Sequence, residues 1–161
     1  MTFNGIDNQS VELKITNYQF PEIVDGDYDS NWLNIYLNVK SKVGHWQTID
    51  PSLTTWDMQR LINWFDNLSK DIEPEYLEIA FLEPNLCFEL LDRFNSQIKT
   101  IRIIFDYESK PKSASEEKEY FVDIIVDNDE LKRIKLDLEK GIYMMTIISK
   151  EGNSTQKFIK N

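Results

Sequence analysis

The stretch "WLNIYLNVKSK", residues 32–42, alternates apolar and polar side chains along its length. One face of such a segment would collect the side chains of Leu33, Ile35, Leu37 and Val39. A period of two residues is typical of a strand with one buried face, so we predict a strand here. Gly44 can then turn the chain, and "HWQTID", residues 45–50, is predicted to return as the second strand of a hairpin that stops at Pro51.

Segments on both sides of this hairpin show strand patterns too. "VELKITN", residues 11–17, repeats the alternation. Four later runs are also predicted as strands: 76–82, 85–94, 100–108 and 120–127. The Glu-Pro-Asn sequence at 83–85 forms a short turn between the first two of these, and the charged stretch 108–119 is predicted to be a long loop.

Residues 54–68 change to a helical period. The apolar positions follow the i, i+3, i+4, i+7 spacing of an amphipathic helix: Met58, Leu61, Ile62, Phe65 and Leu68. Thr54 is a suitable N-cap, with Asp57 three residues later in the capping-box position. Trp64 flanks the apolar stripe, whereas Trp56 falls roughly opposite its centre. Trp56 is therefore either covered by a neighbouring strand or an exposed anchor for a partner.

A second helix is predicted over residues 128–148. Its apolar positions again have helical spacing: Leu131, Ile134, Leu138, Ile142, Met145 and Ile148. Gly141 weakens this prediction, and residues 142–149 form a strand in the alternative interpretation. Residues 151–161 are expected to be a mobile tail.

These segments together predict an α+β fold: a mainly antiparallel curved β-sheet or sandwich of about 6–7 strands, with two helices packed on it. A chain of 161 residues can bury a core and suits a single domain, 1–161. We expect that core to span about 10–150, because residues 1–9 are polar.

The formal net charge is −10, which disfavours free nucleic acid as a ligand and favours a basic partner. Acidic residues concentrate in 25–29, 71–92 and 116–130, although ordinary solvated surface also explains such runs. One cysteine excludes a disulfide within the chain. The start of the chain lacks a signal-peptide pattern, and no apolar run approaches the ~20 residues that span a bilayer. We therefore expect a cytoplasmic protein that makes no membrane contact.

Residues for catalysis or metal binding are scarce. His45 is the single histidine, and Cys87 lies inside the apolar run "LCFELL", where an inert thiol is expected. No phosphate-binding glycine loop or nucleophile motif occurs. The acidic stretch that starts at Asp25 spaces its aspartates like a calcium loop, but Ser30 and Tyr36 occupy the positions that need Gly and Glu. We therefore predict neither an enzyme, nor a metal site, nor a cofactor.

Several motifs in order along the chain resemble those of the WapI family of bacterial immunity proteins. The resemblance covers roughly residues 10–94, with a weaker echo through the last helix. It is carried by Tyr18-Phe20-Pro21, Asp29-Ser30-Asn31-Trp32-Leu33, Thr54 to Leu68, and Glu83-Pro84-Asn85-Leu86 with Phe88. It implies a small cytoplasmic protein that protects its producer from a toxin domain, commonly a nuclease with a basic cleft. An acidic protein suits such a partner because it can shield the basic surface. A monomer or weak dimer is expected.

The candidate contacts with that toxin are Asp25, Asp27, Asp29, Trp56, Glu116 and Glu117. The Asp-Ser-Asn-Trp motif also has a structural explanation, because an Asp turn can lead into a buried aromatic residue. If two of the acidic stretches meet on one face, they form an anionic patch. Two other functions remain open: a small-ligand or enzymatic domain that uses a carboxylate pocket, and an adaptor module in a larger assembly.

Overall fold

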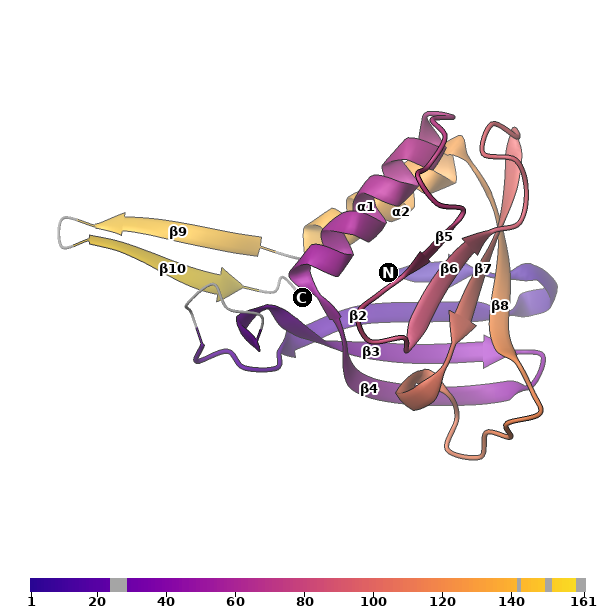
Figure 1. Ribbon diagram of the computed structural model, residues 1–161, viewed down its shortest axis with the longest axis horizontal. Coiled ribbons are helices and arrows are strands. Elements are labelled where there is room, and N and C mark those ends of the chain that lie inside the picture. Colours follow the sequence, from indigo (N-terminus) through magenta and orange to yellow (C-terminus); the bar gives the residue numbers. More distant parts are fainter. Residues whose placement is uncertain (24–28, 142, 150–151, 159–161) are drawn as a thin grey trace.

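The computed structural model describes residues 1–23, 29–141, 143–149 and 152–158 (Figure 1). Its first antiparallel sheet has the strand order β1-β2-β3-β4. The strands of this sheet are β1 (Thr2–Asn4), β2 (Ser10–Tyr18), β3 (Trp32–Ser41) and β4 (Gly44–Thr54). The short helices η1 (Ile6–Asn8) and η2 (Asp29–Asn31) lie in its connections.

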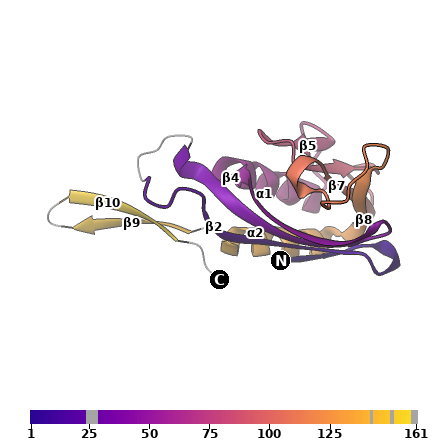
Figure 2. The same cartoon turned by 90° about the horizontal axis from the view of Figure 1, so that it is seen from below.

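The second antiparallel sheet has the order β5-β6-β7-β8. It contains β5 (Glu78–Ala80), β6 (Leu86–Leu90), β7 (Ile98–Phe105) and β8 (Tyr120–Asp127), with η3 (Tyr107–Ser109) after β7. The helices α1 (Thr55–Ser69) and α2 (Asn128–Gly141) pack on one another (Figure 1). A hairpin of β9 (Tyr143–Ser149) and β10 (Gly152–Phe158) projects from the body in both views (Figures 1 and 2).

The two large sheets meet where Gly5 forms a bridge to Ile124 of β8. A Cβ atom at position 5 would lie 2.7 Å from Cγ1 of Val122, so only glycine allows this approach. One hydrophobic core then runs through both sheets and both helices. At its centre the rings of Phe3, Phe65 and Phe88 lie 5.9–6.3 Å apart, which joins β1, α1 and β6.

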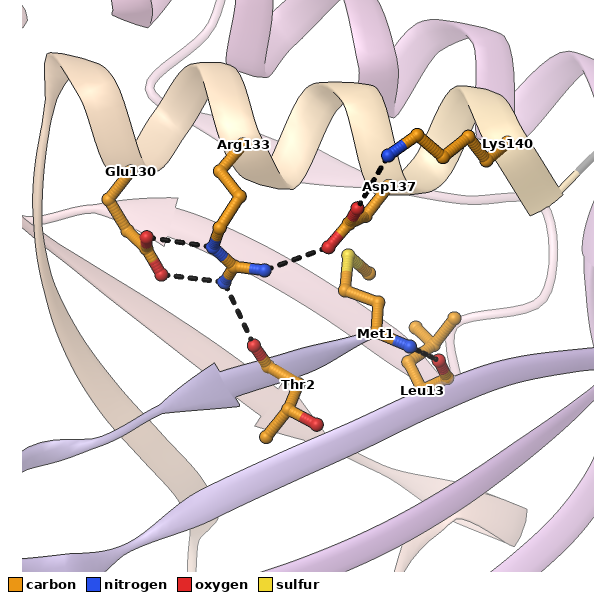
Figure 3. A network of polar contacts seen from close by, with 7 residues as sticks. All are labelled: Met1, Thr2, Leu13, Glu130, Arg133, Asp137 and Lys140. Atoms are coloured by element: carbon orange, nitrogen blue, oxygen red, sulfur yellow. Dashed lines mark hydrogen bonds and ion pairs between the residues drawn. The ribbon is translucent and has the colours of Figure 1, made fainter.

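The N-terminal strand is part of this core, contrary to the expectation that residues 1–9 lie outside it. Phe3 is buried because β1 pairs with β2 along one edge of the first sheet. Arg133 of α2 donates to the carbonyl oxygen of Thr2 at 3.1 Å and to both carboxylate oxygens of Glu130 (Figure 3). The same guanidinium reaches Asp137 at 2.8 Å, so it ties α2 to the first strand.

The predicted α+β class and the antiparallel sheets are confirmed, as is the α1 capping box. The Thr54 hydroxyl accepts from the backbone N–H of Asp57, and the Asp57 carboxylate accepts from the backbone N–H of Thr54. Trp64, which flanks the apolar stripe, is buried, and its Nε1 donates to the carbonyl oxygen of Tyr76. The described residues contain ten strands rather than about 6–7, because β1, β9 and β10 add to those predicted.

Several predicted strand boundaries differ by a few residues, and two further boundaries are wrong in a way that changes an element. The second strand of the first hairpin continues past Pro51 to Thr54, because β4 is an edge strand with a bulge beside that proline. The second helix ends at Gly141, and 143–149 is the strand of the alternative interpretation. Residues 152–158, within the expected tail, form β10. In the described part of the chain, neither α-helix has the length and hydropathy needed to cross a membrane.

Candidate functional site

A cleft of about 430 Å³ opens where one end of the first sheet meets the turns of the second. Its walls come from the ends of β2 and β3, the bulged part of β4, the β5–β6 turn and η3. The lining residues are Gln19, Phe20, Asp29, Trp32, Asp50, Pro51, Glu83, Asn85 and Glu108. This volume falls within the usual range of ligand-sized pockets, about 300–1,000 Å³.

Four carboxylates line the cleft: Asp29, Asp50, Glu83 and Glu108. They come from four different elements, and neither Lys nor Arg occurs among the described residues of the lining. No ion pair involves any of the four within the part of the chain that the structure describes. The cleft therefore concentrates negative charge that the described residues leave without an ion-pair partner.

The side chain of Asn85 is the buried polar group of the cleft. It is 2% exposed, and its Nδ2 donates to Oδ1 of Asp50 and to Oγ of Ser52, both at 3.3 Å. Its Oδ1 has no hydrogen-bond partner among the described residues. An unmatched buried amide oxygen is costly, so the described part of the chain leaves this acceptor of a cleft-lining residue unsatisfied.

A β-bulge brings Ser52 to this amide. Leu53 pairs with Leu33 and Pro51 pairs with Asn34, so Ser52 is an extra residue on β4 without a counterpart on β3. The bulge buries Ser52 and turns it toward Asn85, while Asp50 and Pro51 stay on the cleft wall. Local backbone geometry thus builds the floor of the cleft.

The opposite wall is held by η3. Trp46 of β4 donates from Nε1 to the carbonyl oxygen of Ser109 at 2.8 Å, in a buried contact. The backbone N–H of Asp106 donates to the carbonyl oxygen of Asn85 at 2.9 Å, and the Asp106 side chain caps η3. These bonds fix the turn that presents Glu108 to the cleft.

The pKa of the Asp50 carboxyl is shifted by this environment. Burial raises its pKa above the ordinary value, and the nearby Glu108 and Glu83 carboxylates raise it further, while the hydrogen bond from Asn85 acts in the opposite direction. A cation bound in the cleft would reverse the repulsive contribution. The arrangement is suited to binding positive charge.

The predicted contact residues are distributed over several places. Asp29 lines the cleft, whereas Asp25 and Asp27 lie outside the described residues. Trp56 lies in the first turn of α1 with 45% of its surface exposed, which favours the anchor interpretation over a covered position. The adjacent Thr55 hydroxyl donates to Oδ1 of Asn31 in η2, so the start of α1 is tied to the motif that holds Asp29.

Glu116 and Glu117 belong to a different surface. Glu116 lines a second hollow of about 360 Å³, whose wall also carries Arg102, Lys110 and Lys118. Glu117 is exposed on the same loop. Stretches 25–29 and 71–92 do meet in the cleft, through Asp29 and Glu83, while stretch 116–130 does not contribute to it.

Asp29 is the one lining residue that was singled out from the sequence as a contact; the other three carboxylates and the buried amide were not, namely Asp50, Glu83, Glu108 and Asn85. A signal existed for two of them, because Glu83 and Asn85 belong to one of the quoted motifs. Asp50 and Glu108 had none, since each lies at the edge of a segment with a purely structural pattern. Their roles depend on the bulge and on η3.

Groups that perform catalysis are poorly placed. His45 is exposed on the β3–β4 hairpin and contacts the Asn38 side chain at 2.6 Å. Burial, and then the charges of Glu78 and Glu89, raises the pKa of the Cys87 thiol to about 12, which disfavours the thiolate. Within the described residues, no three His, Cys, Asp or Glu side chains are grouped closely enough to hold a metal ion.

A strip of sequence with exposed apolar side chains precedes the cleft residue Glu83. The segment between α1 and β6 exposes Ile72, Tyr76, Leu77 and Leu82, the last of which precedes Glu83. Acidic residues are interspersed along this strip. Apolar anchors beside charged groups are the composition of a protein–protein contact surface.

Comparison with known proteins assigns this fold to a family. Neither a search of curated proteins nor a search of solved structures finds a match. The model of the immunity protein WapI-like family matches residues 2–143, which includes every residue of the cleft and extends well beyond the predicted resemblance over 10–94. The chain belongs to the immunity protein WapI-like family.

Proposed function

We propose that this protein binds a cognate bacterial toxin domain and neutralises it without catalysis, by setting the acidic cleft against a basic surface of the toxin. The observation that carries the proposal is the cleft itself. Three of the family motifs supply its walls, and four carboxylates without a described ion-pair partner line it. Charge left unmatched in the free protein is available to a partner.

A nuclease is the toxin class that fits this surface. Nucleases hold the phosphate backbone with Lys and Arg, so their active sites are basic clefts. A protein of net charge −10 is attracted to such a cleft and excludes nucleic acid from it. Neutralisation by occupation needs no reaction, in keeping with the poor placement of His45 and Cys87 for catalysis.

The contact extends beyond the cleft in this proposal. Trp56 and the exposed side chains of Tyr76 and Leu82 supply apolar anchors, and the cleft carboxylates supply orientation and association rate. A monomer, or a weak dimer, acts in the cytoplasm of the producing cell, where the toxin would otherwise cause damage. Asp25 and Asp27 remain candidate contacts next to Asp29.

The proposed function is tested by measuring whether the protein protects cells from the toxin. A cell that expresses the toxin domain encoded beside this gene is expected to grow only when the protein is co-expressed, and the two are expected to co-purify. The double variant Glu83→Gln/Glu108→Gln is expected to lose most of the protection. The matched control is Glu12→Gln/Glu139→Gln, which removes the same charge at two ion-paired positions outside the cleft and the candidate contacts. Equal protection by both double variants would remove the cleft from the mechanism, and failure to bind any toxin domain encoded beside the gene would reject the function.

A second candidate function rests on the volume of the cleft. A small cationic ligand fits a carboxylate-lined pocket of about 430 Å³ as well as a protein side chain does. A ligand-binding domain of this kind would bind a polyamine such as spermidine and would give no protection against a toxin. Titration with spermidine and the protection assay separate the two functions.

A further inference from the structure

We propose that the acidic cleft is a socket for one arginine side chain of the partner, with the guanidinium bound between the carboxylates and the free Oδ1 of Asn85. This inference rests on the proposed function and names the chemistry that the cleft recognises. It joins two independent observations: a cluster of carboxylates, and a nearly fully buried amide in the same wall whose oxygen lacks a described partner.

The buried amide distinguishes this cleft from an ordinary acidic surface. Its Nδ2 donates to Asp50 and Ser52, which fixes the orientation of the amide, and its Oδ1 has no donor among the described residues. A guanidinium has five N–H donors in a rigid planar fork. One edge can reach carboxylate oxygens while another donor reaches Asn85. A charged donor at this oxygen would satisfy an acceptor that is otherwise desolvated.

The walls favour arginine over other cations. Phe20 and Trp32 line the cleft with the carboxylates, and a guanidinium stacks on aromatic faces better than the compact, strongly hydrated ammonium of lysine. A divalent metal ion needs several oxygens within about 2–2.6 Å of one point. No group of this kind is present among the described acidic residues, so the carboxylates suit a larger, planar cation.

The free protein bears an electrostatic strain that a guanidinium would relieve. Burial raises the pKa of Asp50, and repulsion by the Glu108 and Glu83 carboxylates raises it further. A bound cation converts that repulsion into attraction and favours the ionised form of Asp50. Binding is therefore expected to release any proton held by Asp50 and to weaken as the pH falls through its raised pKa.

The experiment uses short peptides, so it does not depend on knowing the toxin. The full chain is titrated at low salt with acetyl-Gly-Arg-Gly-amide, with its Lys analogue, and with its citrulline analogue, which keeps the shape but not the charge. Binding is followed by NMR at the side-chain amide of Asn85 and the indole N–H of Trp32. We expect the arginine peptide to bind about tenfold or more tightly than the citrulline peptide, and more tightly than the lysine peptide.

Variants localise that binding. Glu108→Gln removes one exposed carboxylate from the cleft and is expected to weaken binding of the arginine peptide by about tenfold, whereas Glu139→Gln on α2 leaves it unchanged. Equal binding of the arginine and citrulline peptides, absence of arginine-peptide binding, or equal effects of the two substitutions would overturn the socket. Spermidine binding at the same residues without arginine-peptide binding would also overturn it, in favour of a polyamine pocket.

Failure here is distinguishable from failure of the proposed function. If the protein protects against its toxin through the cleft carboxylates but shows no preference for arginine, the proposed function stands and the arginine socket is rejected. If the protein prefers the arginine peptide but protects against no toxin, the arginine socket stands and the immunity function is rejected.

Discussion

Carboxylates in the cleft and carboxylates along α2 have opposite surroundings. On α2, Glu130 and Asp137 share Arg133, and Glu139 lies 2.7 Å from Nζ of Lys135. At the start of this helix, Asn128 joins Asp71 and Lys99 in one network. In the cleft, four carboxylates have no such partner in the described chain. The same residue types stabilise the fold in one region and remain available in the other.

The physical reason is that the charged residues of α2 lie on one helix, whereas those of the cleft come from separate segments of the chain. Helical spacing places acidic and basic residues three or four positions apart on α2, so they pair locally. The cleft collects acidic side chains from separate turns, and Lys112, four residues after Glu108, lies beyond the end of η3 and has no described ion pair with it. Repulsion that raises the pKa of Asp50 is therefore retained in the fold, as is common where a site serves binding and not stability.

The largest expected effect on stability comes from the network in which the charges are paired. Lys99 is fully buried and donates to Asp71, to Asn128 and to the carbonyl oxygen of Ser96 at 2.7–2.9 Å. Lys99→Met leaves these acceptors without their cation and is expected to reduce the free energy of unfolding by about 3–5 kcal/mol. Urea denaturation at neutral pH measures it. A loss below about 1 kcal/mol would break the distinction between structural and available charge.

Substitutions of the cleft carboxylates are expected to weaken toxin binding and to leave stability nearly unchanged. Glu83→Gln/Glu108→Gln is expected to weaken toxin binding by about 10–100-fold, mainly by slowing association, while the free energy of unfolding stays within about 0.5 kcal/mol. Stopped-flow association at two salt concentrations checks this, since salt screens the wild-type rate more than that of the variant. A double variant that binds normally but unfolds easily would show that the cleft is structural.

An intermediate effect is expected at Arg133. Its bonds to Glu130, Asp137 and the Thr2 carbonyl need the planar guanidinium, so Arg133→Lys is expected to destabilise by about 1 kcal/mol although the charge is kept. Thermal unfolding with Lys132→Arg as the control gives the measurement. No difference between the two variants would mean that α2 docks through its apolar face alone.

The smallest expected effect is a gain in stability, on substitution of Asp50. The raised pKa of Asp50 means that its ionised form is less favourable in the folded than in the unfolded state. Asp50→Asn is therefore expected to stabilise the protein at neutral pH, by less than about 1 kcal/mol because the site is half-exposed. The gain should vanish as the pH falls through the raised pKa, since the wild-type carboxyl is then protonated. Urea midpoints from pH 7 to pH 3 test this sign.

Local pattern was a good guide where one face of a segment is buried. The alternation of residues 32–42 identified β3, and the apolar stripe with Thr54 and Asp57 identified α1 and its cap. Pattern was a poor guide where a distant segment decides the outcome. Residues 1–9 are polar on average, yet Phe3 is buried because Phe65 and Phe88 surround it. At Gly141, helical and strand periods fit the following apolar run equally well, and the chain adopts the strand.

The sequence by itself determined the α+β class, the antiparallel strands, the negative charge and the resemblance to immunity proteins, because each depends on composition or on neighbours within a few residues. Only the tertiary structure decided which carboxylates meet. Asp29 and Glu83 were visible as acidic stretches, but Asp50 and Glu108 join them through a bulge at Ser52 and the anchoring of η3 by Trp46. Convergence of side chains from turns some 80 residues apart depends on backbone register, and register is set by the packing of the whole core.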